Sequence, residues 1–242
     1  MKRPILVLLL LTVALGARAQ RAEGPHLSAG LAVGTTGVAA EATVLLPREI
    51  GFRAGFNWLQ AGVPLSFKLP EDFGGDGSSL GFKAQLNLNH GYVLTDIYLS
   101  PKSSFHLTGG VWVGSPVLMR LYNTAPLPDA LNSIGIDVDG YSVHAIDGNL
   151  SAELRVNAVK PYLGVGFGRL RADRHWSVSF DVGVLWWGNP GVFATGYNIL
   201  DEAMEVQLTS AALDNVDKGI LDKVGRVMVY PVLRCVVNYR IF

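Results

Sequence analysis

Large apolar side chains occupy every second position of the segment 176–186. These positions are Trp176, Val178, Phe180, Val182, Val184 and Trp186. Most of the residues between them are small or polar, namely Ser177, Ser179, Asp181 and Gly183. Because successive side chains of a β-strand point to opposite faces, this alternation predicts a strand with one apolar face and one small or polar face.

The same period of two recurs along most of the chain and predicts an all-β fold of about eight antiparallel strands. The predicted strands are 26–34, 38–47, 50–67, 80–99, 105–121, 150–169, 175–188 and 226–242. Inside two of these strands the apolar positions change parity, after Gln60 and again after Ala158. One-residue slips of this kind predict β-bulges, which are common in barrels.

The polar faces of the predicted strands are rich in glycine and asparagine and carry isolated charges. Such faces suit the interior of a narrow barrel, where glycine leaves room and opposite charges pair. We therefore predict an antiparallel transmembrane β-barrel with an apolar outer face. The charges turned inward are Arg53, Lys83, Arg155, Lys160, Arg234 and Arg240, with Glu41, Glu153 and Asp181. Either these groups pair and plug the lumen, or their basic excess lines a narrow path for anions.

The connections between the predicted strands alternate in length, as they do in outer-membrane barrels. The short ones lie at 46–49, 100–103 and 171–174, and the long ones at 70–79, 122–149 and 188–225. A further tight connection near 35–37 separates the first two strands. Both ends of the barrel then lie on the side of the short connections, which we expect to be periplasmic.

The last long connection carries a different pattern. Apolar residues recur there at every fourth position: Leu200, Met204, Leu208, Ala212, Val216 and Ile220. Asp201 and Glu202 precede this pattern, whereas Lys218 and Lys223 lie near its end, which complements a helix dipole. The sequence thus predicts an amphipathic helical insertion at about 198–224, before the last strand.

The first residues are typical of an export signal. Lys2 and Arg3 precede an apolar run at 5–15, and the small residues Ala17 and Ala19 follow at the expected cleavage site. We predict a signal peptide at 1–19 and a barrel domain at 20–242. Without the signal the chain holds 17 basic against 20 acidic residues, which argues against a nucleic-acid partner. With one cysteine, Cys235, the chain has no internal disulfide framework.

Several motifs occur together in this chain: "KPYLGVGFGR" at 160–169, "WSVSFDVGVLWWGNP" at 176–190, "YPVL" at 230–233, the segment 80–110 with Asp96 before a short turn, and the terminal Phe242. Together they resemble a widespread family of small bacterial outer-membrane β-barrel proteins. The broader architecture is similar to OmpA-type and OmpW-type barrels. The resemblance implies a monomer in the outer membrane of a Gram-negative bacterium. Its partners would be outer-membrane lipids, lipopolysaccharide and the barrel-assembly machinery. It implies no settled activity.

We predict no catalytic, cofactor-binding or metal-binding residues. The five histidines are scattered over separate elements, and no pair has the close spacing of a zinc site. "GVGFG" at 164–168 lacks the spacing of a dinucleotide loop. Its alternate glycines are better explained as positions that leave room for other side chains inside a barrel. "DVDG" at 137–140 has too few ligands for a calcium loop.

Three functions fit this sequence. A structural or surface-interaction role for the long connections comes first, and a small-solute transporter or narrow channel comes second. A lipid A-modifying enzyme comes third, because some small barrels of this size use histidine with serine and an acid. Its candidate segments are "HLS" at 26–28 and "HLT" at 106–108. Both lie near the periplasmic ends of their strands, the wrong rim for that chemistry, so we expect that the protein is not an enzyme.

Overall fold

A computed structural model describes most of the chain beyond its first residues. It covers 25–47, 49–68, 79–100, 103–127, 136–138, 141–143, 148–169, 175–197, 203–208 and 228–241. Every regular element in these ranges is a β-strand. No helix in this part of the chain is long and apolar enough to cross a membrane. The predicted signal peptide at 1–19 lies outside the described residues.

Eight antiparallel strands close into a barrel, which confirms the predicted fold class. In order around the barrel they are β1 (His26–Gly34), β16 (Val229–Arg240), β13 (Trp176–Trp186), β12 (Val159–Phe167), β7 (Phe105–Gly114), β6 (His90–Tyr98), β3 (Ile50–Trp58) and β2 (Gly37–Leu46). The first and last strands pair with each other, as in the contact of Leu31 with Val237, so the barrel has no open edge.

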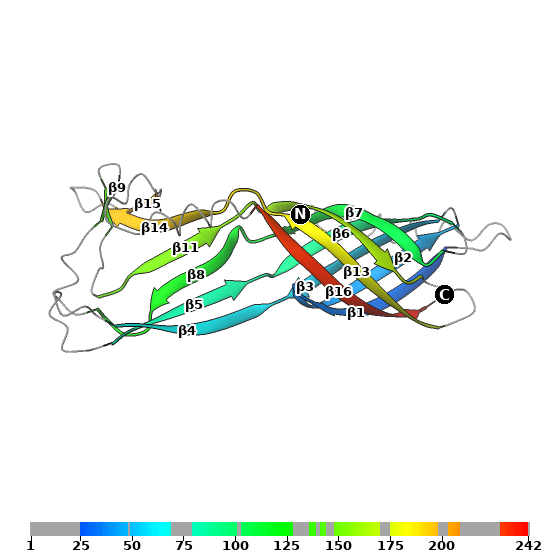
Figure 1. The fold of residues 1–242 in the computed structure, drawn as a ribbon, viewed down its shortest axis with the longest axis horizontal. Helices are drawn as coiled ribbons and strands as arrows, with labels where there is room; N and C mark the ends of the chain where they lie inside the picture. The colour runs from blue at the N-terminus through cyan, green and yellow to red at the C-terminus, as the bar shows by residue number, and fades with distance from the viewer. Residues whose placement is uncertain are drawn as a thin grey trace, which may run out of the picture.

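A second, open sheet extends the barrel beyond the ends that carry the long connections (Figure 1). Its strands in order are β4 (Gln60–Lys68), β5 (Ser79–Asn87), β8 (Val117–Asn123), β11 (Ser151–Arg155), β14 (Gly191–Tyr197), β10 (Tyr141–Val143) and β9 (Ile136–Val138), and β15 (Ala203–Leu208) pairs with β14. Backbone hydrogen bonds join the two sheets, for example from Leu88 N–H to Leu59 O at 2.8 Å.

Four of the predicted long strands are each two strands with a short interruption. The ranges 50–67, 80–99, 105–121 and 150–169 are broken at 59, 88–89, 115–116 and 156–158. At each break the chain leaves the closed barrel and enters the open sheet, or the reverse. The predicted strands were therefore correct in position but too long.

The barrel and the second sheet turn their apolar faces in opposite directions. In the barrel the apolar positions point outward, as Phe52 and Val182 do. In the second sheet they point inward, because Leu86 and Leu154 pack against a buried cluster of Leu88, Leu118, Val156 and Trp187. The parity changes after Gln60 and Ala158 mark this inversion. The register passes Gln60 unchanged, from Asn57 with His90 to Gln60 with Asn87, so the bulge predicted there is wrong. Near Ala158, Arg155 and Tyr162 are seven positions apart whereas their partners Gly191 and Leu185 are six apart, so the chain holds one extra residue there, as the predicted bulge requires. A register shift does occur at Leu154/Arg155, where β11 pairs with β8.

The predicted helical insertion is wrong over 203–208, which form β15. This strand pairs with β14 through contacts such as Val206 with Ala194. Met204 and Leu208 fit both a period of four and a period of two, so their spacing could not distinguish a helix from a strand. The remaining parts of the prediction, 198–202 and 209–224, lie outside the described residues.

Glycines make room for the side chains that fill the barrel. A Cβ atom on Gly166 of β12 would collide with His106 Nε2 and Asp181 Oδ1. Gly37, at the tight connection between β1 and β2, has φ of 97°, a conformation that favours glycine. The expected role of the alternate glycines at 164–168 as space inside the barrel is thus confirmed for Gly166.

We predict that Gly166→Ala destabilises the folded barrel by about 1–3 kcal/mol, because the added methyl group overpacks the lumen. Gly109→Ala on the neighbouring β7 is the matched control, since a Cβ atom there meets nothing within 4 Å. Urea unfolding of the two variants, refolded in the same detergent, measures the difference. Equal stability of both variants would contradict the packing described here.

Candidate functional site

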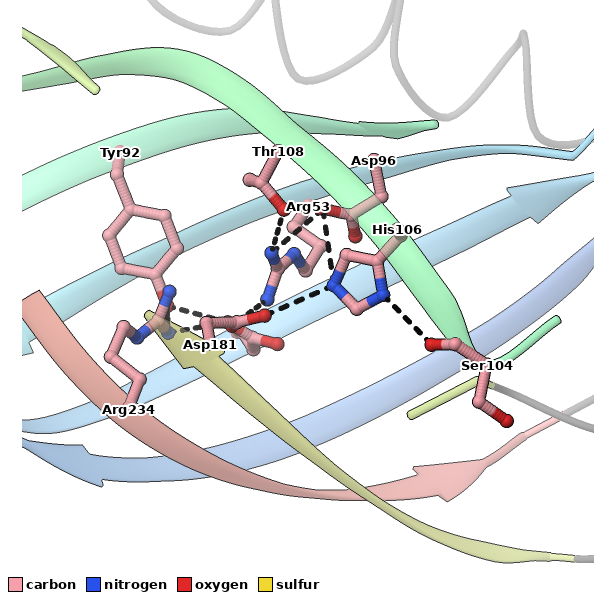
Figure 2. A network of polar contacts seen from close by, with 9 residues as sticks. Arg53, Tyr92, Asp96, Ser104, His106, Thr108, Asp181 and Arg234 are labelled. Atoms are coloured by element: carbon pink, nitrogen blue, oxygen red, sulfur yellow. Dashed lines mark hydrogen bonds and ion pairs between the residues drawn. The ribbon is translucent and has the colours of Figure 1, made fainter. Parts of the chain in front are cut away.

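The guanidinium group of Arg53 is the centre of a buried polar network in the lumen (Figure 2). Its Nη1 donates to Asp181 Oδ2 at 2.5 Å, and its Nη2 donates to Asp96 Oδ1 at 2.8 Å. Asp181 lies on β13, across the barrel from β3, whereas Asp96 lies on the adjacent β6. One cation thus ties opposite walls of the barrel together.

His106 and Thr108 on β7 complete this network. His106 Nε2 lies 3.1 Å from Asp181 Oδ1, and its Nδ1 lies 3.4 Å from the backbone oxygen of Ser104. The Thr108 hydroxyl donates to Asp96 Oδ1 at 2.7 Å. Both ring nitrogens of His106 therefore face oxygen acceptors, and neither is directed at a serine hydroxyl.

A second group of contacts lies beside the first. Arg234 Nη2 donates to Glu41 Oε2 and to the hydroxyl oxygen of Tyr92, each at 2.7 Å. Tyr92 in turn donates to Glu41 Oε2 at 2.8 Å. The Arg234 guanidinium also lies 4.6 Å from the centre of the Tyr92 ring, a cation–π contact. The two groups place Arg53 and Arg234 against Glu41, Asp96 and Asp181.

An aromatic layer fills the lumen next to the charges. The Tyr92 and Trp112 rings stack with their centres 4.9 Å apart, and Tyr162 lies 6.2 Å from Trp112. Trp112 is 0% exposed, and the apolar side chains packed with it, Leu94 and Val232, are also 0% exposed. This layer occupies the barrel interior as a packed core.

A small polar pocket opens at the end of the barrel that carries the short connections. It is lined by Arg53, His106, Arg169, Ser177, Ser179 and Asn238, among others. The Arg169 guanidinium lies 4.7 Å from the centre of the Tyr98 ring and donates to Ser100 O at 3.0 Å. The pocket therefore ends at the Arg53 network.

Only some of the charged residues predicted to face the lumen lie there in the structure. Arg53, Lys160, Arg234, Glu41 and Asp181 are buried in the barrel as expected. Lys83, Glu153 and Arg155 lie on β5 and β11 of the second sheet, outside the lumen. Arg240 is half-buried at the last position of β16.

Asp96 is a further buried acid of the lumen, outside the set of predicted lumen charges. Its parity could have revealed it, because His90, Tyr92, Leu94 and Asp96 alternate along β6 and are all buried. With Asp96 included, the described lumen holds Arg53, Lys160 and Arg234 against Glu41, Asp96 and Asp181. The basic excess on which an anion path depended is absent from this part of the chain.

The structure brings none of the other candidate motifs into a catalytic or metal-binding arrangement among the described residues. His26 and His106 lie at or next to the first residues of β1 and β7, both at the end with the short connections. Val138 of "DVDG" ends β9, and the next two residues lie outside the described ranges. Within the described residues, no group of three or more His, Cys, Asp or Glu side chains could hold a metal ion.

Comparisons with known proteins identify no family for this chain. No family model matches it, and no curated protein matches it. Among solved structures it is similar to Acinetobacter baumannii CarO2, with 20% identity and a TM-score of 0.48 over 89% of this chain and 98% of that one. It is also similar to Acinetobacter baumannii CarO, with 19% identity and a TM-score of 0.43 over 88% and 96%. The resemblance to OmpA-type and OmpW-type barrels stays a prediction.

We predict that Asp181→Asn lets the barrel form but weakens it by about 3–5 kcal/mol, because Arg53 loses half of its buried negative charge. Arg120→Gln is the control: it breaks a pair whose arginine side chain is 55% exposed, and surface pairs contribute at most about 1 kcal/mol. Unfolding in urea, followed by tryptophan fluorescence, measures both. Similar losses in the two variants would show that the lumen network does not stabilise the barrel.

Proposed function

We propose that this protein is an integral outer-membrane barrel that acts as a structural or surface-interaction protein. The observation that carries this proposal is a continuous outer belt of exposed apolar side chains on the closed barrel. All eight barrel strands contribute to it: Leu31, Val38, Phe52, Val93, Val111, Leu163, Val182 and Leu233 are examples, one from each strand. A water-soluble barrel would leave these side chains in unfavourable contact with water.

The belt ends where the barrel ends. Among the described side chains of the second sheet, Val63 is the one large apolar group that is comparably exposed. The second sheet instead packs its apolar face inward, as sheets in water do. This difference supports a barrel in lipid and a second sheet in water.

Exposed aromatic rings lie at both ends of the belt. At the end with the short connections, Trp176 contacts Tyr239 with ring centres 5.0 Å apart. At the other end, Phe56 contacts Trp58 at 4.9 Å, and Trp186 is exposed. Trp and Tyr gather at membrane–water interfaces in transmembrane barrels, so the two groups fit two girdles.

The second sheet then projects from the cell surface, because the long connections of outer-membrane barrels are extracellular. Its strands and connections provide the surface for an interaction. We propose that the chain is exported by its signal peptide at 1–19, inserted by the barrel-assembly machinery, and active as a monomer. Its lipid partners would be outer-membrane lipids and lipopolysaccharide.

The transporter and enzyme alternatives receive less support from the site. A channel needs a free path, and the buried layer around Trp112 fills the described lumen. A lipid A-modifying enzyme needs a histidine directed at a serine, and both nitrogens of His106 face other acceptors. The surface-interaction role needs neither feature.

The mobility of the unheated protein on a denaturing gel tests the barrel in the membrane. We expect membrane-extracted full chain to migrate differently before and after boiling, as closed barrels do. Recovery of the protein as a soluble periplasmic species would refute the proposal.

We predict that Val182→Arg blocks assembly of the barrel in cells. Val182 is 54% exposed near the middle of β13, and an arginine on the lipid-facing side at this depth costs about 2–4 kcal/mol. Gln85→Arg on the exposed side of β5 is the control and should assemble normally, since that position lies in water. The fraction of heat-modifiable protein measures assembly, and normal assembly of both variants would invalidate the lipid-facing assignment.

We predict that the full chain in planar lipid bilayers produces no steady conductance steps, because the aromatic layer and the ion pairs fill the lumen. The measurement is single-channel recording with the refolded protein, and an open porin serves as positive control. Steady anion-selective steps would favour the channel alternative over the structural role.

A further inference from the structure

The outer face of the second sheet carries a compact group of charges beyond the end of the apolar belt. Glu153 Oε1 accepts two hydrogen bonds from Arg120, at 2.8 and 2.5 Å. Glu153 Oε2 accepts two from Arg155, at 2.9 and 2.6 Å. One carboxylate thus binds two guanidinium groups at once. The three side chains together keep a net positive charge.

These side chains face away from the interior. Arg120 pairs in register with Gln85 on one side and with Glu153 on the other, so the three share one face of the sheet. The next residues along these strands, Leu86 and Leu154, pack against the buried cluster at the mouth of the barrel. The face that carries Arg120 and Glu153 is therefore the outer one.

Lys83 adds a third cation to this face. It lies two residues from Gln85 along β5, its side chain is exposed, and its register partner is Tyr122. Arg155 lies 5.0 Å from the centre of the Phe193 ring, which fixes its orientation. We call Lys83, Arg120, Arg155 and Glu153 the basic patch; it holds three cations and one anion.

The acid within the patch stays charged. Partial burial alone would raise the pKa of the Glu153 carboxyl, but the hydrogen bonds from Arg155 and Arg120 outweigh it, and the pKa lies below its usual value. Each arginine uses its Nε and one terminal nitrogen on Glu153. The remaining N–H groups of Arg120, whose side chain is 55% exposed, can donate to a second anion, and guanidinium groups match phosphate oxygens in geometry.

The height of the patch selects the kind of phosphate. Arg155 lies four residues before Val159, the first position of β12 and part of the belt, and Arg120 lies seven residues after Val113. On tilted strands this places the patch roughly 10–20 Å beyond the belt. The headgroup layer of an ordinary phospholipid is only about 6 Å deep, so it lies largely below the patch.

We propose that the basic patch binds the phosphate groups on the sugar headgroup of lipopolysaccharide in the surrounding outer leaflet. This inference rests on the proposed function, since it requires the barrel to lie in the outer membrane with its second sheet outside. It gives the second sheet a defined partner at the membrane surface, through Lys83 and Arg120, while Arg155 adds positive charge beside them.

Binding of purified lipopolysaccharide by the refolded full chain tests this inference. The probes are lipopolysaccharide with its phosphates, the same material dephosphorylated with hydrofluoric acid, and phosphatidylglycerol micelles. We expect the phosphorylated form to bind most tightly. The double variant Lys83→Gln with Arg120→Gln should weaken that binding about 30-fold, at roughly fivefold per cation near an anionic surface. It leaves the contact between Arg155 and Glu153 in place, so the sheet keeps its main ion pair.

Two control variants test whether the effect depends on charge and on the position of the cations. Lys83→Arg with Arg120→Lys keeps the charges and should retain binding within a few-fold. Arg169→Gln removes a cation at the opposite end of the barrel and should leave binding unchanged. The inference is overturned if the double variant binds like the unaltered chain, if Arg169→Gln weakens binding equally, or if phosphatidylglycerol binds as tightly as lipopolysaccharide.

Gel mobility of the same preparations separates this inference from the proposed function. If the unheated protein shows no barrel mobility, the membrane assignment itself fails. If the mobility is that of a closed barrel and no preference for phosphate exists, only the binding role of the basic patch fails.

Discussion

The ion pairs of Arg53 link three walls of the barrel, and much of the interior is arranged around them. The guanidinium reaches Asp181 across the lumen and Asp96 on the neighbouring strand. His106 contacts the other oxygen of Asp181, and Thr108 donates to the same Asp96 oxygen as Arg53. A buried charge without partners is strongly destabilising, so each member of this network requires the others. The glycine at 166 follows from the same requirement, because a larger residue would occupy the space of His106 and Asp181.

Under the proposed function, a change of solvent along the barrel axis explains the inversion of apolar faces. In lipid the outside of a sheet is the apolar side, and polar groups gather in the lumen. In water the outside is polar, and apolar groups such as Leu86 and Leu154 turn inward. At the interruptions between the two sheets, backbone hydrogen bonds such as that from Leu88 N–H to Leu59 O still join neighbouring segments. The position where the pattern inverts therefore marks the membrane surface under the proposed function.

The packed lumen and the exposed second sheet together favour a protein that acts from its surface. The aromatic layer of Tyr92, Trp112 and Tyr162 makes the barrel a rigid support. The second sheet has its own buried cluster of Ala194 and Val206, so it is a structured platform at the barrel mouth. Charges on its outer face, chiefly Arg120 and Arg155 on Glu153, are held in place by hydrogen bonds.

The sequence by itself determined that the chain forms amphipathic antiparallel strands, where most of them lie, and that connections alternate between short and long. These features depend on the period of two and on local turn residues. Only the tertiary structure decided which face of each strand points inward, because alternation shows that two faces differ and not what each one meets. Lys83 and Glu153 were for this reason assigned to the lumen, whereas the place of Asp96 could have been predicted from its alternation with His90, Tyr92 and Leu94. Strand pairing also decided the conformation of 203–208, whose apolar spacing fits a helix and a strand equally well.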